Sequence, residues 1–379
     1  MRRQLALIAA VVGIALLWSP LMRPIGAGTI IVGDIYTSAL WDRNVAAYVT
    51  PPPRVEDGVE QVGDGEMRIT WWIPGWGARH PAIMLVNGAT EKGNDDPETR
   101  RLADALARGG YLVMLPEFPF IKNGTLERGA TAILDAAFAR ALARPETRGM
   151  RVGAFGFSVG GGMLLAAASR DGALASASYI GALGAYFDLR TYLASVLSRM
   201  QRRDGALEPW TPDPEVDVRL PVAAAEALAD PGERDRLTAE LRSAGGRLTG
   251  EPPTFFGAEG AALWRVLTAR GYDEVLERLN ELPPSLREVF DSLSPSTAWR
   301  AIRAPVYWLH DVGDRFEPIS EAETAAATPD AANTHLARTA LLSHAAALGE
   351  GAKEKGADFW IAELSGLLLF AASALAAGG

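Results

Sequence analysis

Residues 151–168, RVGAFGFSVGGGMLLAAA, decide the fold of this 379-residue chain. The stretch starts as an apolar run typical of a buried strand and ends as an alanine-rich helix, with G-x-S-x-G between them at Gly156, Ser158 and Gly160. A serine at the apex of so sharp a turn has strained backbone angles, and the glycines relieve contacts with the strand and the helix. The helix N-terminus adds free amides that favour developing negative charge. This segment therefore predicts that Ser158 is a nucleophile.

The flanking sequence alternates short apolar runs with helical patterns. Residues 82–86 (AIMLV) and 111–115 (YLVML) are typical of buried strands, and Asp96 with Pro97 begins a helix between them as N-cap and first helical residue. A further strand is expected at 306–310 (VYWLH). This alternation predicts an α/β fold with a mostly parallel central sheet and flanking helices.

An acid and a base are expected after Ser158 in the order serine, acid, histidine. Asp314 lies in a loop just beyond the strand at 306–310, and Asp311 is the alternative acid closer to the strand end. His344 lies beyond the end of the last predicted strand, whereas the alternative base, His335, lies near its start. Because active groups gather at the carboxyl ends of parallel strands, this rule favours His344.

These residues resemble the α/β-hydrolase superfamily over about half of the chain, from about residue 81 to 168 and from about 294 to the C-terminus. The resemblance is closer to the dienelactone-hydrolase-like and prolyl-oligopeptidase-like branches than to lipases. It implies an α/β-hydrolase fold in which Ser158 is the nucleophile, Asp314 the acid of an "H-G-x-x-D-x-x-x-P" type segment and His344 the base. It implies no metal and no organic cofactor.

The resemblance also implies an oxyanion hole formed by the backbone amides of Ala89 and Val159. The chain departs from the family pattern at two positions. Asn87 replaces the usual histidine before Gly88, and Asp311 stands where the family often has glycine. The first departure affects the shape of the oxyanion loop, and the second leaves two candidate acids.

The composition excludes several classes of function. Lys and Arg total 37 and Asp and Glu 46, which gives a net charge of −9 and disfavours nucleic-acid binding. There is no cysteine, which rules out thiol nucleophiles, disulfides and Cys-ligated metal sites, and the presence of only four histidines argues against a His-rich metal cluster.

More than 100 residues separate the strand after Ser158 from the strand at 306–310, so we expect a helical cap insert at 188–297. Four aromatic residues of the insert are candidates to line an apolar acyl pocket: Trp210, Phe255, Phe256 and Trp264. Tyr186, just before the insert, is a further candidate for substrate binding at the rim of the site. The alternative interpretation is that the cap aromatics form the core of the cap itself.

Both ends of the chain are apolar. Arg2 and Arg3 precede an uncharged run from Gln4 to Met22, which favours an uncleaved signal anchor with the catalytic domain outside the cell membrane. A cleaved signal peptide, giving a secreted protein, and a buried helix are the alternatives. The C-terminal run at 364–377 is expected to be a packing helix, with a second membrane span as the alternative.

The predicted organisation is a signal anchor or signal peptide (1–28), a linker and first strand region (29–66), two parts of a hydrolase core (67–187 and 298–379) and the cap (188–297). The predicted function is hydrolysis of an ester or thioester of a small-molecule acyl substrate. A serine peptidase, an acyltransferase and a catalytically silent binding protein on the same fold are the alternatives. The sequence does not fix the oligomeric state.

Overall fold

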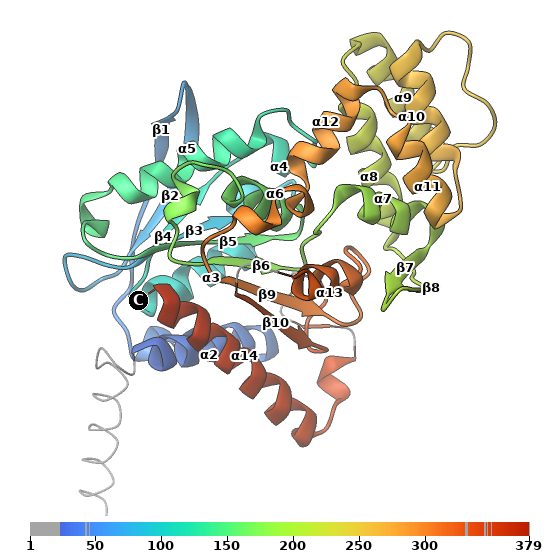
Figure 1. Cartoon of the computed structure of the whole chain (residues 1–379). Helices are drawn as coiled ribbons and strands as arrows, with labels where there is room; N and C mark the ends of the chain where they lie inside the picture. The colour runs from blue at the N-terminus through green and yellow to red at the C-terminus, as the bar shows by residue number, and fades with distance from the viewer. Residues whose placement is uncertain are drawn as a thin grey trace, which may run out of the picture.

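The computed structural model describes residues 23–41, 44, 46–329, 333–344, 346, 348–349 and 351–378. An eight-stranded sheet forms its centre, in the order β1-β2-β4-β3-β5-β6-β9-β10 (Figure 1). β1 and β2 pair antiparallel with each other and β2 pairs antiparallel with β4, and the other neighbours are parallel. The strands are β1 (Arg54–Val62), β2 (Gly65–Ile73), β3 (Ala82–Val86), β4 (Leu112–Pro116), β5 (Val152–Phe157), β6 (Ile180–Leu183), β9 (Val306–Asp311) and β10 (Thr334–Thr339).

Burial explains the sequences of these strands. Every residue of β3, β4, β6 and β9 is buried, as expected for parallel strands that are covered on both faces. β1 reads RVEDGVEQV and is largely exposed at the edge of the sheet, where its charged side chains discourage pairing with another chain.

Helices cover both faces of the sheet. One face carries α5 (Ala130–Ala143), α6 (Ser158–Ala168) and α13 (Ile319–Ala327), and the opposite face carries α2 (Arg23–Trp41), α3 (Pro97–Arg108) and α14 (Ala357–Gly378). Figure 1 shows α2 and α14 side by side beneath the sheet. Asp96 caps α3 by accepting a hydrogen bond from the amide of Thr99, and Pro97 follows as its first residue, as predicted.

The insert forms a separate helical lobe at the upper right of Figure 1. Its helices are α7 (Leu189–Ser198), α8 (Pro214–Glu226), α9 (Pro231–Ser243), α10 (Ala258–Thr268), α11 (Tyr272–Asn280) and α12 (Pro284–Leu293). It also contains the hairpin of β7 (Met200–Arg203) and β8 (Ala206–Pro209), which we did not predict. α4 (Pro119–Asn123) lies between β4 and α5 in the chain.

The region before β1 differs from the expected spacer. The three prolines at 51–53 are extended, but Arg23–Trp41 form helix α2, which packs against α14 and α3. The proline stretch at 51–53 was the feature that suggested a spacer. Helix α2 depends on packing against α14 and α3, which the sequence alone does not show. Most of the predicted anchor at 1–28 lies outside the described residues, which begin at Arg23.

Candidate active site

Ser158 stands at a sharp turn between β5 and α6, as the motif predicts. Its φ of 51° is in the left-handed region, and its side chain is buried. A Cβ on Gly156 would lie 2.6 Å from Cα of Gly161, and one on Gly160 would collide with the carbonyl oxygen of Asn87. Any larger residue at these two positions would therefore push the strand, the helix or the loop after β3 away from the serine.

Asp314 and His344 meet above the carboxyl ends of β9 and β10. Nδ1 of His344 lies 2.8 Å from Oδ2 of Asp314. The other carboxylate oxygen of Asp314 accepts hydrogen bonds from the amides of Phe316 (2.7 Å) and Glu317 (3.1 Å). Burial by itself raises the pKa of Asp314, but the neighbouring histidines and these hydrogen bonds hold that pKa below its usual value.

The two alternatives to this pair lie elsewhere. Asp311 accepts a hydrogen bond from the amide of Gly313 at 2.7 Å, and burial raises its pKa to about 6. The imidazole of His335 stacks on the ring of Tyr307, with centroids 4.8 Å apart, on the exposed side of β10. Of the two acids that the sequence offered, Asp314 is therefore the one that contacts His344.

Glu317 is a third acidic group in the site, and it was not predicted from the sequence. Its side chain is 1% exposed. Oγ of Ser158 donates a hydrogen bond to Oε1 of Glu317 at 2.8 Å, and Nδ1 of His344 lies 3.3 Å from Oε2. Ser158 and His344 therefore contact one carboxylate, whereas we expected the hydroxyl to contact the imidazole directly. Its position three residues after Asp314 in the same loop was the available signal.

The charges of this cluster are strongly coupled. Burial raises the pKa of Glu317 well above its usual value. Burial by itself lowers the pKa of His344, but the carboxylates of Asp314 and Glu317 outweigh it and raise that pKa to about 9. The pKa values of Asp314, Glu317 and His344 therefore depend on one another.

Four further contacts fix the loop that carries Asp314. The ring of Phe316 stacks on the imidazole of His344, with centroids 4.7 Å apart. His310, fully buried at the end of β9, contacts the carbonyl oxygen of Glu317 through Nε2 at 3.0 Å, and the same Nε2 lies 3.7 Å from Asp314. From the cap, Nε1 of Trp210 donates to the carbonyl oxygen of Asp314 at 2.8 Å. The cap and the sheet together position the acid.

The loop after β3, residues 87–96, faces Ser158 from the other side. The side chain of Asn87 donates to the carbonyl oxygen of Gly93 (2.9 Å) and accepts from the hydroxyl of Thr99 (2.6 Å). From α8, the guanidinium of Arg219 donates to the carbonyl oxygen of Ala89 at 3.0 Å. Asn87 thus takes a structural part in the loop, although it replaces the histidine of the family pattern.

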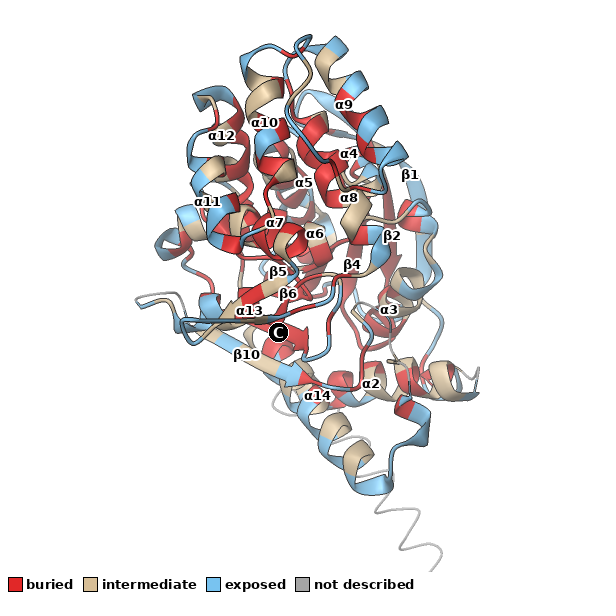
Figure 2. Cartoon of the chain, turned by 90° about the vertical axis from the view of Figure 1, so that its right-hand side faces the viewer, coloured by how far each residue is buried: buried red, intermediate tan, exposed pale blue. Residues whose placement is uncertain are grey.

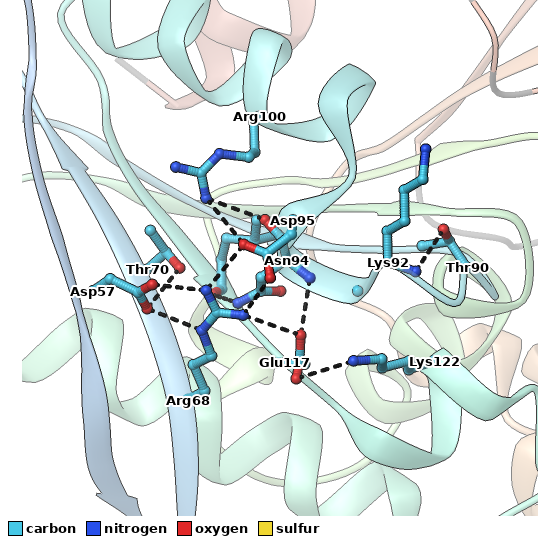
Figure 3. Close-up of polar contacts among 12 residues, drawn as sticks. Asp57, Arg68, Thr70, Thr90, Lys92, Asn94, Asp95, Arg100, Glu117 and Lys122 are labelled. Atoms are coloured by element: carbon cyan, nitrogen blue, oxygen red, sulfur yellow. Dashed lines mark hydrogen bonds and ion pairs between the residues drawn. The ribbon is translucent and has the colours of Figure 1, made fainter.

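A network of charged residues holds the far side of this loop (Figure 3). Arg68 on β2 donates to Asp95 at 2.8 and 3.0 Å and to Asp57 at 2.7 and 3.1 Å. Glu117, just after β4, accepts from the amide of Asn94 at 3.0 Å. The loop is thereby attached to three strands of the sheet, which restricts its motion beside Ser158.

A cavity of about 370 Å³ adjoins Ser158 and His344, and Ala89 and Val159 also line it. The five aromatic side chains that we proposed for the pocket and its rim are not among those that line it. Trp210 binds the acid loop, Phe256 packs between Phe255 and Trp264, and the hydroxyl of Tyr186 donates to the carbonyl of Leu293. Phe255 is 49% exposed. These residues serve the packing of the cap and the core.

Asp314, Glu317 and His344 also form a set of potential metal ligands. One ligand atom from each lies within 4.8 Å of the others. A divalent ion held there would occupy the same Nδ1 and carboxylate oxygens that orient the imidazole. Attack by a serine that an adjacent base activates needs no such ion.

The sheet order, the strained serine between β5 and α6, and the acid and histidine at neighbouring strand ends define the architecture. The fold is that of the α/β hydrolases. No protein-family model and no curated protein matches the sequence.

Several solved hydrolase structures are similar to the chain at low identity. A dienelactone hydrolase from Anabaena variabilis is 13% identical, with a TM-score of 0.45, over 85% of this chain and 97% of that one. A 2,6-dihydroxy-pseudo-oxynicotine hydrolase is 15% identical, with a TM-score of 0.47, over 97% and 85%. The acylaminoacyl peptidase of Pyrococcus horikoshii is 13% identical, with a TM-score of 0.47, over 86% of this chain but 42% of the peptidase. At these identities the structural similarity does not indicate which substrate the chain binds.

Proposed function

We propose that the chain is a serine hydrolase that cleaves a carboxylic ester or thioester through an acyl-enzyme intermediate. The observation that carries this proposal is the strained, buried Ser158 placed beside the bonded pair of His344 and Asp314. A φ of 51° at a serine is a strained backbone conformation that costs conformational energy. Such strain persists where the surrounding structure fixes the residue, and strained residues cluster at functional sites.

The mechanism begins when the hydroxyl of Ser158 turns from Glu317 to Nε2 of His344. His344 takes the hydroxyl proton as the serine oxygen attacks the carbonyl carbon, and Asp314 holds the imidazole through Nδ1–H and stabilises its charged form. The amides of Ala89 and Val159 receive the oxyanion. Donors of this kind contribute about 3–4 kcal/mol each to the transition state.

The tetrahedral intermediate collapses as His344 returns its proton to the leaving alcohol or thiol, which leaves the acyl group on Ser158. A water molecule then attacks the acyl carbon, with His344 taking its proton, and the carboxylic acid leaves as Ser158 recovers its hydrogen. The role of Glu317 in this cycle is to hold the serine hydroxyl in the resting state.

Fluorophosphonate labelling and p-nitrophenyl ester turnover test the proposal with Ser158→Ala. We expect wild-type protein to label and turn over, and the variant to lose both. Ser176→Ala is the matched control, because Ser176 is exposed and precedes β6, at the opposite end of the parallel strands from Ser158. Equal labelling of Ser158→Ala and wild type would contradict the assignment, and no labelling of wild type would favour a catalytically silent protein.

We also propose that the chain is attached to the cell membrane with its catalytic domain outside. The uncharged run from Gln4 to Met22 supports this location. Among the described residues one helix, α14, has the length and composition to cross a membrane, although 22% of its most apolar window is buried. Carbonate extraction of membranes tests the attachment: release of the full chain into the soluble fraction would contradict it.

A further inference from the structure

The sequence analysis predicted a substrate pocket lined by aromatic residues of the cap. The cavity at Ser158 instead extends into a different part of the molecule. Its lining includes side chains of β3, β5 and β9 that point to the face covered by α2, α3 and α14. It therefore continues from the nucleophile into the layer between the sheet and these helices, on the side opposite to α5 and α6. The layer between a sheet and its covering helices is normally packed as closely as a crystal of small organic molecules. A continuous cavity in this layer therefore indicates a ligand-binding site.

The walls of this part of the cavity, the lower lobe, are almost entirely apolar. Its lining residues come from the sheet, α2 and α14, and include Ile31, Ile35, Ile83, Leu85, Leu367 and Phe370. The charged residues that line the cavity lie on and just before α3 (Asp96, Glu98, Arg101), on α8 (Glu215, Arg219) and beside Ser158 (Glu317). The ester group would thus lie at Ser158, between an apolar lobe and a polar one.

The lower lobe has an inner end, away from Ser158 and near the amino end of β6. Ala374 and Leu375 of α14 and Tyr179 beside β6 line it there. The hydroxyl of Tyr111 donates to the carbonyl oxygen of Leu375 at 3.3 Å, which attaches α14 to the sheet. A substrate chain entering from Ser158 would therefore meet a fixed wall, so the lobe would measure chain length.

The helices that form the outer wall pack tightly against each other. A Cβ on Gly28 of α2 would lie 3.3 Å from Cδ1 of Leu368 and 3.4 Å from the amide of Ala372, so glycine permits this close approach. α14 carries no charged residue from Leu364 to Ala376, and its Ile361 and Leu369 are 65% and 69% exposed. Figure 2 shows exposed and intermediate residues along much of α14. An apolar outer face of this kind suits contact with lipid.

We propose that the lower lobe binds the long aliphatic acyl chain of the substrate, between the sheet and the α2–α14 pair. This inference rests on the proposed function and names its substrate class as long-chain acyl esters. The polar lobe at α8 would hold the leaving group. The chain could come from a membrane lipid or from a free ester, and the two sources share this chemistry.

Ala374→Phe in the full-length protein fills the inner end of the lower lobe. Ala376→Phe is the matched control, because Ala376 is exposed on the same helix and does not line the cavity. On p-nitrophenyl esters from butanoate to hexadecanoate, we expect wild-type kcat/KM to rise with chain length. Ala374→Phe should lower it about ten-fold or more for hexadecanoate and leave butanoate nearly unchanged. Ala376→Phe should match wild type. An unchanged chain-length profile in Ala374→Phe would overturn the proposal.

Binding of a fluorescent long-chain fatty acid to Ser158→Ala separates this inference from the proposed function. The two proposals can fail separately. If wild type hydrolyses no ester, the hydrolase proposal fails. If the probe nevertheless binds, and Ala374→Phe weakens its binding about ten-fold or more, the proposal that the lower lobe binds an acyl chain is supported. If Ser158→Ala binds the probe equally well with and without Ala374→Phe, the proposal that the lower lobe binds the acyl chain is wrong. If Ala374→Phe has a lower melting temperature than wild type, Leu375→Phe is used in its place, and the same results are expected. Supplying the hexadecanoyl ester in phosphatidylcholine vesicles or in detergent identifies the source: preference for vesicles indicates a membrane lipid.

Discussion

The two loops that flank Ser158 differ in how their polar groups are satisfied. The loop at 87–96 is held on its far side by Arg68, which bonds Asp95 of the loop and Asp57 of β1 (Figure 3), and its Gly88 lies close to Ser158. The loop at 311–318 buries three carboxylates, of Asp311, Asp314 and Glu317, near the imidazoles of His310 and His344, and the pKa values of these carboxyl groups move in opposite directions. Asp314, with two amide donors, keeps its charge at neutral pH, whereas burial raises the pKa of Glu317 to about 8, so Glu317 is charged in the pH range where His344 titrates.

The comparison suggests a division of labour. The first loop is built for rigidity, which an oxyanion hole needs because its donors must be in place before charge develops. The second is built for proton movement, because groups with opposed pKa shifts identify acid and base roles. Variants in each loop should therefore change different kinetic quantities.

The largest effect is expected for Asp314→Asn. The substitution keeps the shape but removes the charge that stabilises the imidazolium and fixes its tautomer, so kcat should fall by about 10³–10⁴. Asp311→Asn is the matched control: it retains an oxygen that can accept from Gly313, and kcat should stay within about three-fold of wild type. Steady-state kinetics on an activated ester measure both. A larger loss in Asp311→Asn would transfer the acid role to that residue.

A smaller effect, on pH dependence, is expected for Glu317→Gln. His344 acts as a base only when neutral, so kcat/KM should rise as pH rises through its pKa, which the carboxylates hold at about 9. Removing the charge of Glu317 lowers that pKa, so the acid limb of the profile should move to lower pH by about one unit. The amide can still accept the Ser158 hydroxyl.

Glu321→Gln is the control for this shift. Glu321 is equally buried, and burial raises its pKa to about 7, but it accepts hydrogen bonds from Phe187, Asp188 and Thr191 rather than from the site. We expect its pH profile to match wild type. An acid limb of Glu317→Gln that stays in place or moves to higher pH would show that this carboxylate does not control His344.

The sequence predicts the parts of the site that depend on local pattern. Ser158 follows from glycine spacing, and the pair of Asp314 and His344 follows from chain order and strand ends. The first rule acts within a few residues, and the second needs only the order of the residues along the chain and the positions of the strand ends. The β7–β8 hairpin was missed because short strands in a helical insert carry little periodic signal.

Other features depend on contacts between distant segments. The burial of Glu317 comes from the packing of its loop against Ser158 and His344, which no residue pattern records. The lower lobe depends on the approach of α2 to α14, two helices from opposite ends of the chain. The cap aromatics illustrate the converse, because their apolar character fits a core as well as a pocket.

The smallest effect is expected where the cap meets the loop at 87–96. Arg219 of α8 donates to the carbonyl oxygen of Ala89 and forms an ion pair with Glu215 at 2.9 Å. Arg219→Met keeps the apolar stem but removes the donor, so the peptide that supplies the proposed oxyanion amide is held less firmly. We expect kcat to fall about three- to ten-fold, less than for loss of a direct donor. Glu215→Gln breaks the ion pair alone, and its kcat should stay near that of wild type. Equal losses in both variants would show that the ion pair, rather than the bond to Ala89, connects the cap to the site.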